Sequence, residues 1–232
     1  MTVKQFIRFT SDSGAIEKIL RLLQSISQVL AAYALTSEDV QTWLLLRRQF
    51  ALGRRYIRFF RWIECLSKAY TVFYDETGLV AVVGVGKWSC MSAFLFLESL
   101  TILDVMGVWP TDWAKQCIIE ANKFWFYALI FSLLWDVVQL FAPKNIVSNV
   151  ASLEKRKAEV ESSSNEALVA RRKAEAEQRQ KRARITRRLV VNGLDLLIPG
   201  HVTGWIVTSA VMTGFAGAVS TALSMKDIWD KL

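Results

Sequence analysis

Residues 202–225 form a run of 24 residues without a charged side chain. At about 1.5 Å per residue, a helix of this length crosses the roughly 30 Å hydrocarbon core of a bilayer. The run therefore predicts a transmembrane helix, with a buried helix of a soluble protein as the alternative. Small residues at every fourth position would let a helix of a second copy approach closely, so we expect self-association there. These residues are Ala210, Gly214, Ala218 and Ala222.

Two other apolar segments come earlier in the chain. Residues 124–142 contain a single charge, Asp136, and begin with a cluster of aromatic residues that is typical of a membrane interface. Residues 79–109 are also apolar, and we expect them to be membrane-embedded or packed against other helices. Their charged residues are Lys87, Glu98 and Asp104. With 53% hydrophobic residues, the chain is predicted to be an all-α membrane protein with amphipathic helices plus two or three membrane-embedded helices.

Changes in composition divide the sequence into four regions. We expect an N-terminal amphipathic-helix region (1–78), apolar membrane-embedded helices (79–143), a charged solvent-exposed helix or linker (144–188) and a C-terminal element with the transmembrane helix (189–232). With two spans, both termini would be cytosolic and the basic residues 151–188 would lie in the lumen, against the positive-inside tendency. Three spans would return those residues to the cytosol and place the C-terminus inside.

Two helices are predicted in the N-terminal region. Residues 15–35 have apolar side chains at helical spacing, which suits either lipid contact or packing against a neighbouring helix. A second helix is predicted to begin at Ser37-Glu38-Asp39, where acidic residues favour a helix start. We expect it to continue to about Tyr74, because residues 75–78 (DETG) are typical of a turn.

Within the second helix, residues 44–62 read LLLRRQFALGRRYIRFFRW and contain six arginines without an acidic residue. On a helical projection the arginines fall within an arc of roughly 140°, opposite a face of leucine, isoleucine and aromatic side chains. This segregation is typical of a helix that lies on a membrane, with arginines at the headgroups and apolar residues below them. The predicted membrane-binding residues are Arg47, Arg48, Phe50, Arg54, Arg55, Tyr56, Arg58, Phe59, Phe60, Arg61 and Ile63.

The net charge of +8 would also suit a nucleic-acid partner. Bases that stack along a bound strand need aromatic residues beside the positive charges, whereas here the aromatic residues lie mainly opposite the arginines. We therefore expect an anionic phospholipid membrane as the partner and no nucleic acid. Salt-sensitive oligonucleotide binding without membrane partition would favour the opposite interpretation.

Motifs for catalysis or metal binding are lacking in the sequence. The chain has one histidine, His201, and three widely spaced cysteines, which do not suit a metal site or a histidine-based triad. The string GVGKWS at 84–89 resembles a phosphate-binding loop but lacks both the earlier glycine and the Ser/Thr that must follow the lysine. We expect neither enzymatic activity nor a cofactor.

The order of these segments is similar to that of the peroxin-11 family of peroxisomal membrane proteins. The resemblance depends on the basic and aromatic helix RRQFALGRRYIRFFRW, the apolar middle, the charged stretch, and the element RRLVVNGLDLLIPG (187–200) before the terminal apolar run. It covers nearly the whole chain, and its more specific parts are the first element and Asn192, Asp195 and Pro199.

The resemblance implies a protein of the peroxisomal membrane that promotes membrane elongation and tubulation before peroxisome fission and proliferation. Its N-terminal region would face the cytosol and insert an amphipathic helix into the cytosolic leaflet. It would form a homo-oligomer and cooperate with a fission adaptor and a dynamin-related GTPase. A channel for small metabolites or ions is the alternative that the resemblance leaves open, and Glu98, Asp104 and Asp136 would then line a polar pathway.

Overall fold

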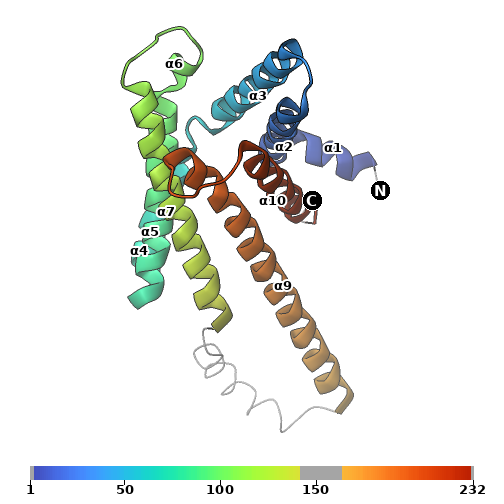
Figure 1. Cartoon of the computed structure of the whole chain (residues 1–232). Coiled ribbons are helices and arrows are strands. Elements are labelled where there is room, and N and C mark those ends of the chain that lie inside the picture. Colours follow the sequence, from blue (N-terminus) through green and yellow to red (C-terminus); the bar gives the residue numbers. More distant parts are fainter. Residues whose placement is uncertain (1–2, 142–163, 231–232) are drawn as a thin grey trace.

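The computed structural model describes residues 3–141 and 164–230, and all of the regular structure in these ranges is helical (Figure 1). The N-terminal region consists of α1 (Val3–Ser11), α2 (Ser13–Tyr33), α3 (Ser37–Arg58) and α4 (Arg61–Asp75). They are followed by α5 (Gly78–Leu100), α6 (Ile102–Val105) and α7 (Ala114–Phe141), and then by α9 (Ser164–Thr203) and α10 (Ala210–Trp229). This confirms the predicted all-α fold.

The helices do not pack in chain order. Each packs against the next in the series α4, α5, α7, α9, α10, α2 and α3, and α3 returns to contact α5 and α6. The C-terminal helix α10 therefore lies against the N-terminal helix α2 (Figure 1). This order places the inner faces of α2, α3, α5, α7 and α9 around a common interior.

An aromatic core joins α4, α5 and α7. Its buried members are Cys65, Phe94, Leu95 and Ala121, and tryptophans from all three helices pack around them. Phe94 and Trp125 stack with their ring centroids 5.2 Å apart. Gly84 allows closer packing, because a Cβ there would lie 2.7 Å from side-chain atoms of both Trp135 and Val72.

Two of the described helices are long and apolar enough to cross a membrane, namely α5 over residues 78–100 and α7 over residues 114–140. They correspond to the two earlier apolar segments of the sequence, which are therefore helical and long enough to cross a membrane. The second of these helices begins ten residues before the segment predicted from hydropathy. The charged linker predicted at 144–188 is described only from Ser164, and residues 144–163 lie outside the described ranges.

The prediction of one continuous terminal transmembrane helix over residues 202–225 was wrong. Helix α9 ends at Thr203, Gly204 has a φ of +76°, and α10 begins only at Ala210. The Ser209 side chain caps α10 by accepting a hydrogen bond of 3.1 Å from the Met212 backbone N–H. Helix α10 also includes the charged residues Lys226 and Asp227, and it is not among the helices that are long and apolar enough to cross a membrane.

The predicted helix over residues 37–74 is likewise divided. It begins as predicted, since the Thr36 side chain accepts a hydrogen bond from the Asp39 backbone N–H. Helix α3 ends at Arg58, however, and α4 begins at Arg61. Two residues, Phe59 and Phe60, therefore allow the chain to change direction between the two helices.

Candidate membrane-contacting surface and buried charge network

The break between α3 and α4 is held by two serines of α5. The Ser99 hydroxyl donates a hydrogen bond of 3.0 Å to the carbonyl oxygen of Phe59, and the Ser92 hydroxyl donates one of 2.8 Å to that of Trp62. Carbonyls at the C-terminal end of a helix, such as that of Phe59 after α3, lack partners within the helix, and a buried carbonyl needs one. Ser99 supplies this partner, and Ser92 adds a second link at the first turn of α4, so the two serines fix the break on the surface of α5.

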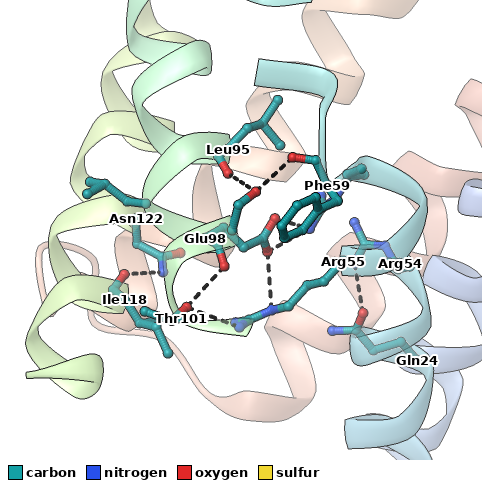
Figure 2. Close-up of polar contacts among 12 residues, drawn as sticks. Gln24, Arg54, Arg55, Phe59, Leu95, Glu98, Thr101, Ile118 and Asn122 are labelled. Carbon is teal, nitrogen blue, oxygen red and sulfur yellow. Dashed lines mark hydrogen bonds and ion pairs between the residues drawn. The ribbon is translucent and has the colours of Figure 1, made fainter. Parts of the chain in front are cut away.

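Three arginines of α3 point into the protein, and Figure 2 shows two of them, Arg54 and Arg55. The Arg54 guanidinium donates to a Glu17 carboxylate oxygen at 2.8 Å and to the Gln24 side-chain oxygen at 2.7 Å, which joins α3 to α2. Arg58 donates to both Glu98 oxygens at 2.7 Å. Arg55 lies 3.5 Å from the same carboxylate, so the two arginines join α3 to α5.

Burial determines how strongly the two members of the Glu17–Arg54 ion pair affect each other. The side chain of Glu17 is 4% exposed and that of Arg54 is 10% exposed, so neither charge is solvated by bulk water. Burial alone would raise the pKa of Glu17, but the nearby positive charges of Arg54, Lys18 and Arg58 outweigh this effect and hold the pKa well below its usual range. Burial, aided by the charge of Arg58, lowers the pKa of Arg54 to about 10. Both groups remain charged at neutral pH.

A second buried pair joins α2 to α9. Arg21 donates to the two oxygens of Asp195 at 3.0 and 2.5 Å, in the bidentate geometry that a guanidinium and a carboxylate favour. Both residues are buried, at 5% and 6% exposure. Glu17, Arg21, Arg54, Arg55, Arg58, Glu98 and Asp195 are called the buried charge network below.

The remaining arginines of the predicted membrane-binding set are placed differently. Arg48 and Arg61 are exposed, and Arg47 is half-buried. Within the described part of the chain, Arg47 makes no ion pair, and its Nε atom is buried without a hydrogen-bond partner. The six arginines therefore do not form one row that faces solvent or headgroups. Membrane binding by the set stays a prediction.

The apolar side of α3 and α4 is directed outward. On α4 the exposed apolar side chains recur at helical spacing and share one face, which we call the α4 apolar face. It consists of Phe60, Ile63, Leu66, Tyr70, Phe73 and Tyr74, which are 49% to 69% exposed. On α3, Leu45, Leu46, Tyr56 and Ile57 are also exposed, at 36% to 55%. Among the predicted membrane-binding aromatics, Phe50 and Phe59 are half-buried.

Comparison with known proteins identifies the family to which this chain belongs. The family described as Peroxisomal biogenesis factor 11 (PEX11) matches residues 3–229. The chain belongs to the PEX11 family. The match spans the basic helix, both candidate membrane helices and the terminal element, as the resemblance predicted. This family description names a biogenesis factor and not an enzyme.

Curated relatives agree with the PEX11 assignment over nearly their full length. Peroxisomal membrane protein PMP27 of Saccharomyces cerevisiae is 26% identical over 98% of this chain and 94% of its own. Peroxisomal membrane protein PMP30A of Candida boidinii is 25% identical with the same two coverages. No solved structure matches the chain. These relatives are named as peroxisomal membrane proteins, which agrees with the two candidate spans.

The small-residue stripe of this PEX11 family member is partly used within the chain. Gly214 is buried against α2, where an added Cβ would lie 2.8 Å from the Val29 side chain. Ala218 is half-buried, while Ala210 and Ala222 are exposed. Self-association through the stripe stays a prediction, and the structure leaves its two ends accessible.

The three acidic residues that suggested a polar pathway all have protein partners. Glu98 pairs with Arg58, and Asp104 accepts a hydrogen bond of 2.9 Å from the Thr111 backbone N–H. Asp136 lies 2.8 Å from Arg188 of α9 and also accepts a hydrogen bond from Asn192. The contacts of Glu98 and Asp136 join helices, whereas that of Asp104 lies within the 101–113 segment, and a polar pathway lined by these acids stays a prediction.

Sequence reasoning missed Glu17 and Asp195 as partners of arginines. Glu17 is the only acid of α2, and Asp195 is the only acid between Glu177 and Asp227. A single acid among apolar positions of a helix is a signal that a buried partner exists elsewhere in the chain. The partner itself could not be identified, because Glu17 and Arg54 are 37 residues apart and Arg21 and Asp195 are 174 apart.

Proposed function

We propose that this chain is a peroxisomal membrane protein that promotes membrane elongation and tubulation before peroxisome fission and proliferation. The observation that supports this function best is the α4 apolar face, because six large apolar side chains on one helix face remain exposed in the folded protein. A patch of this kind marks contact with a membrane or a partner. Membership of the PEX11 family and two candidate spans favour the membrane.

The physical mechanism is insertion of the α4 apolar face and the adjoining end of α3 into one leaflet. A helix buried about 5 to 10 Å into the headgroup and acyl boundary expands that leaflet and favours positive curvature. Each large apolar side chain that leaves water contributes roughly 1.5 to 3 kcal/mol. The buried charge network positions α3 for this insertion, since Arg54 and Arg58 hold the helix on α2 and α5 with its apolar side outward.

Charge and assembly complete the proposal. Exposed Arg48 and Arg61 would contact anionic phospholipid headgroups beside the inserted face. Homo-oligomers would raise the local density of inserted helices, with the exposed ends of the small-residue stripe as one contact. A fission adaptor and a dynamin-related GTPase are the partners that the family resemblance suggests for the step after elongation.

The orientation of the chain follows from the two spans. If α5 and α7 are the segments that cross, Gly78 at the start of α5 and Phe141 at the end of α7 lie on the same side of the membrane. Residues 171–188 of α9 contain nine Lys/Arg and two Glu. Cytoplasmic segments carry such an excess of positive charge, so we assign this side to the cytosol.

Reconstitution into anionic liposomes tests the mechanism. Ile63→Glu and Tyr70→Glu each place a charge within the α4 apolar face, whereas Thr71→Glu places the same charge at an exposed polar position beside it. We expect electron microscopy to show tubules with the wild-type protein and with Thr71→Glu, and few with the other two variants. Tubulation by Tyr70→Glu at the wild-type level would refute insertion of this face. Resistance to carbonate extraction checks that every variant is membrane-integrated.

A further inference from the structure

A cavity of about 510 Å³ lies beside the buried charge network, between α2, α3, α5, α7, α9 and α10. Five arginines line it, namely Arg21, Arg47, Arg54, Arg55 and Arg58, together with a single carboxylate, that of Glu98. Figure 2 shows Arg54 and Arg55 extending from α3 toward the helices on either side. The cavity is separate from the α4 apolar face, whose residues do not line it.

The charges around this cavity do not balance. Asp195 pairs with Arg21, Glu17 pairs with Arg54, and Glu98 is shared between Arg55 and Arg58. Among the described residues, three carboxylates therefore offset five guanidinium groups, which leaves a net charge of +2, and Arg47 is the arginine without a carboxylate partner. An excess of positive charge that is partly buried is costly unless an anion offsets it.

Two donors at the cavity also lack acceptors. The Nε atoms of Arg47 and Arg58 are both buried, and neither has a hydrogen-bond partner among the described residues. Arg58 donates to both Glu98 oxygens from one terminal nitrogen, Nη2, so its Nε–H remains available. Buried N–H groups almost always have a partner in folded proteins. An oxygen-rich anion beside Arg47 would supply an acceptor for the Nε–H of that residue.

The other walls of the cavity are apolar. They include Leu44 of α3, Phe94 of α5, Trp125 of α7 and Ile198 of α9. Glu98 lies two residues before α5 ends at Leu100, and Asn122 is in the third turn of α7. The cavity is therefore near the ends of the two candidate spans that the 101–113 segment connects, which is where lipid headgroups would lie.

We propose that this cavity binds a phosphate-bearing anion, with Arg47 as the donor that holds the phosphate. Arginine presents a planar fork of N–H groups that matches phosphate oxygens. Arg58 lies eleven residues further along α3, roughly 16 Å away along the helix axis, so it adds to the positive charge of the cavity and does not contact the same phosphate. The group can belong to a lipid headgroup, whose acyl chain would contact the apolar walls, or to free phosphate.

Binding to the purified full-length chain in a non-ionic detergent tests this site. The probes are inorganic phosphate, short-chain phosphatidic acid and a phosphatidylcholine of the same chain length. Arg47→Gln removes a donor that makes no ion pair, so it should leave the fold intact, and Arg48→Gln removes the same charge from the exposed neighbouring position. We expect Arg47→Gln to weaken phosphatidic acid binding about tenfold or more, and Arg48→Gln to change it little.

The combination of probes identifies the source of the phosphate. Binding of phosphatidic acid alone supports a lipid headgroup, and competition by inorganic phosphate supports a site for the phosphate group itself. Ala51→Trp, which fills the cavity without a change in charge, should also abolish binding, and circular dichroism checks that it is folded. Equal effects of Arg47→Gln and Arg48→Gln, equal binding of phosphatidylcholine, or no binding of either phosphate probe would overturn the proposal.

Discussion

Removal of the negative charge from Glu17 is expected to destabilise the whole helix arrangement. The Glu17→Gln substitution keeps the shape of the side chain but leaves Arg54 without a carboxylate partner. Arg54 is 8% exposed, so its charge cannot be solvated by rotation into water. Glu17 also lies 3.9 Å from Arg58, so a second guanidinium loses part of its compensation.

The size of the effect follows from this burial. Loss of one partner of a buried ion pair costs about 3 to 5 kcal/mol, because the remaining charge is buried and uncompensated. For a chain of this size, 1 kcal/mol corresponds to about 2 to 4 °C in the midpoint of thermal unfolding. We therefore expect Glu17→Gln to lower the midpoint by roughly 6 to 20 °C.

Thermal unfolding followed by circular dichroism in detergent micelles measures this shift. The double variant Glu17→Leu with Arg54→Met replaces the pair by apolar side chains and should recover most of the loss, since such replacements are often neutral or stabilising. Exposed Glu76→Gln, outside the helices, is the matched control and should leave the midpoint nearly unchanged. A Glu17→Gln midpoint equal to that of the wild type, or a double variant no more stable than the single one, would refute the reasoning.

Three further predictions follow from the same contacts. Gly84→Ala should destabilise the protein by about 1 to 3 kcal/mol, because the added Cβ would lie 2.7 Å from the Trp135 side chain. Gly193→Ala, which has open space around it, should instead stabilise α9 by roughly 0.5 to 1 kcal/mol. Thermal unfolding of the two variants measures both effects. Because the pKa of Glu17 is lowered in the folded protein, its contribution to folding stability is complete above the carboxyl pKa of the unfolded chain, about 4.3. That contribution is lost as the pH falls toward the lower pKa of the folded protein. The difference in stability between wild type and Glu17→Gln should thus be the same at pH 5 and pH 7 and begin to close only below about pH 4. Arg48→Ala and Arg61→Ala should weaken liposome binding most at low salt, because added salt screens exposed charges. The loss of folding stability caused by Arg54→Ala should not change with salt, because Arg54 is buried. A salt-dependent loss for Arg54→Ala would mean that its ion pair with Glu17 is solvated.

Local patterns predicted the helical class and most helix positions. The start of α3 at Ser37 and the apolar helices α5 and α7 follow from capping residues and hydropathy, which depend only on neighbours in the chain. The outward direction of Tyr56, Phe60 and Ile63 also agrees with the helical projection. Features determined within about ten residues could thus be predicted from the sequence alone.

Features that depend on distant partners could not. The break at Phe59 and Phe60 is held by serines 30 and 40 residues away, and the local periodicity continues through it. The arginines of α3 were expected at headgroups because residues 44–62 contain no acid, yet their partners come from α2 and α5. Segregation of arginines on one helix face does not distinguish a face that meets lipid phosphates from one that meets buried carboxylates.

The terminal apolar run shows a different limit. Hydropathy averages over the run and does not register that Gly204 adopts a positive φ or that Ser209 caps a new helix. Both signals are present in the sequence, since glycine favours such a φ and serine is a preferred N-cap. The absence of charge in this run therefore reflects the packing of α10 against α2 and α9. It does not reflect one continuous helix across a membrane.

The depth of single residues in a reconstituted bilayer tests the central claim most directly. With the three native cysteines replaced, an environment-sensitive fluorophore is attached at Phe60→Cys, Tyr70→Cys or Glu64→Cys, the last on the polar side of α4, and quenching by brominated lipids is compared with quenching by aqueous iodide. We predict that brominated lipids quench the labels at positions 60 and 70 and that iodide quenches the label at 64. Quenching of all three labels by iodide alone would contradict membrane insertion of the α4 apolar face.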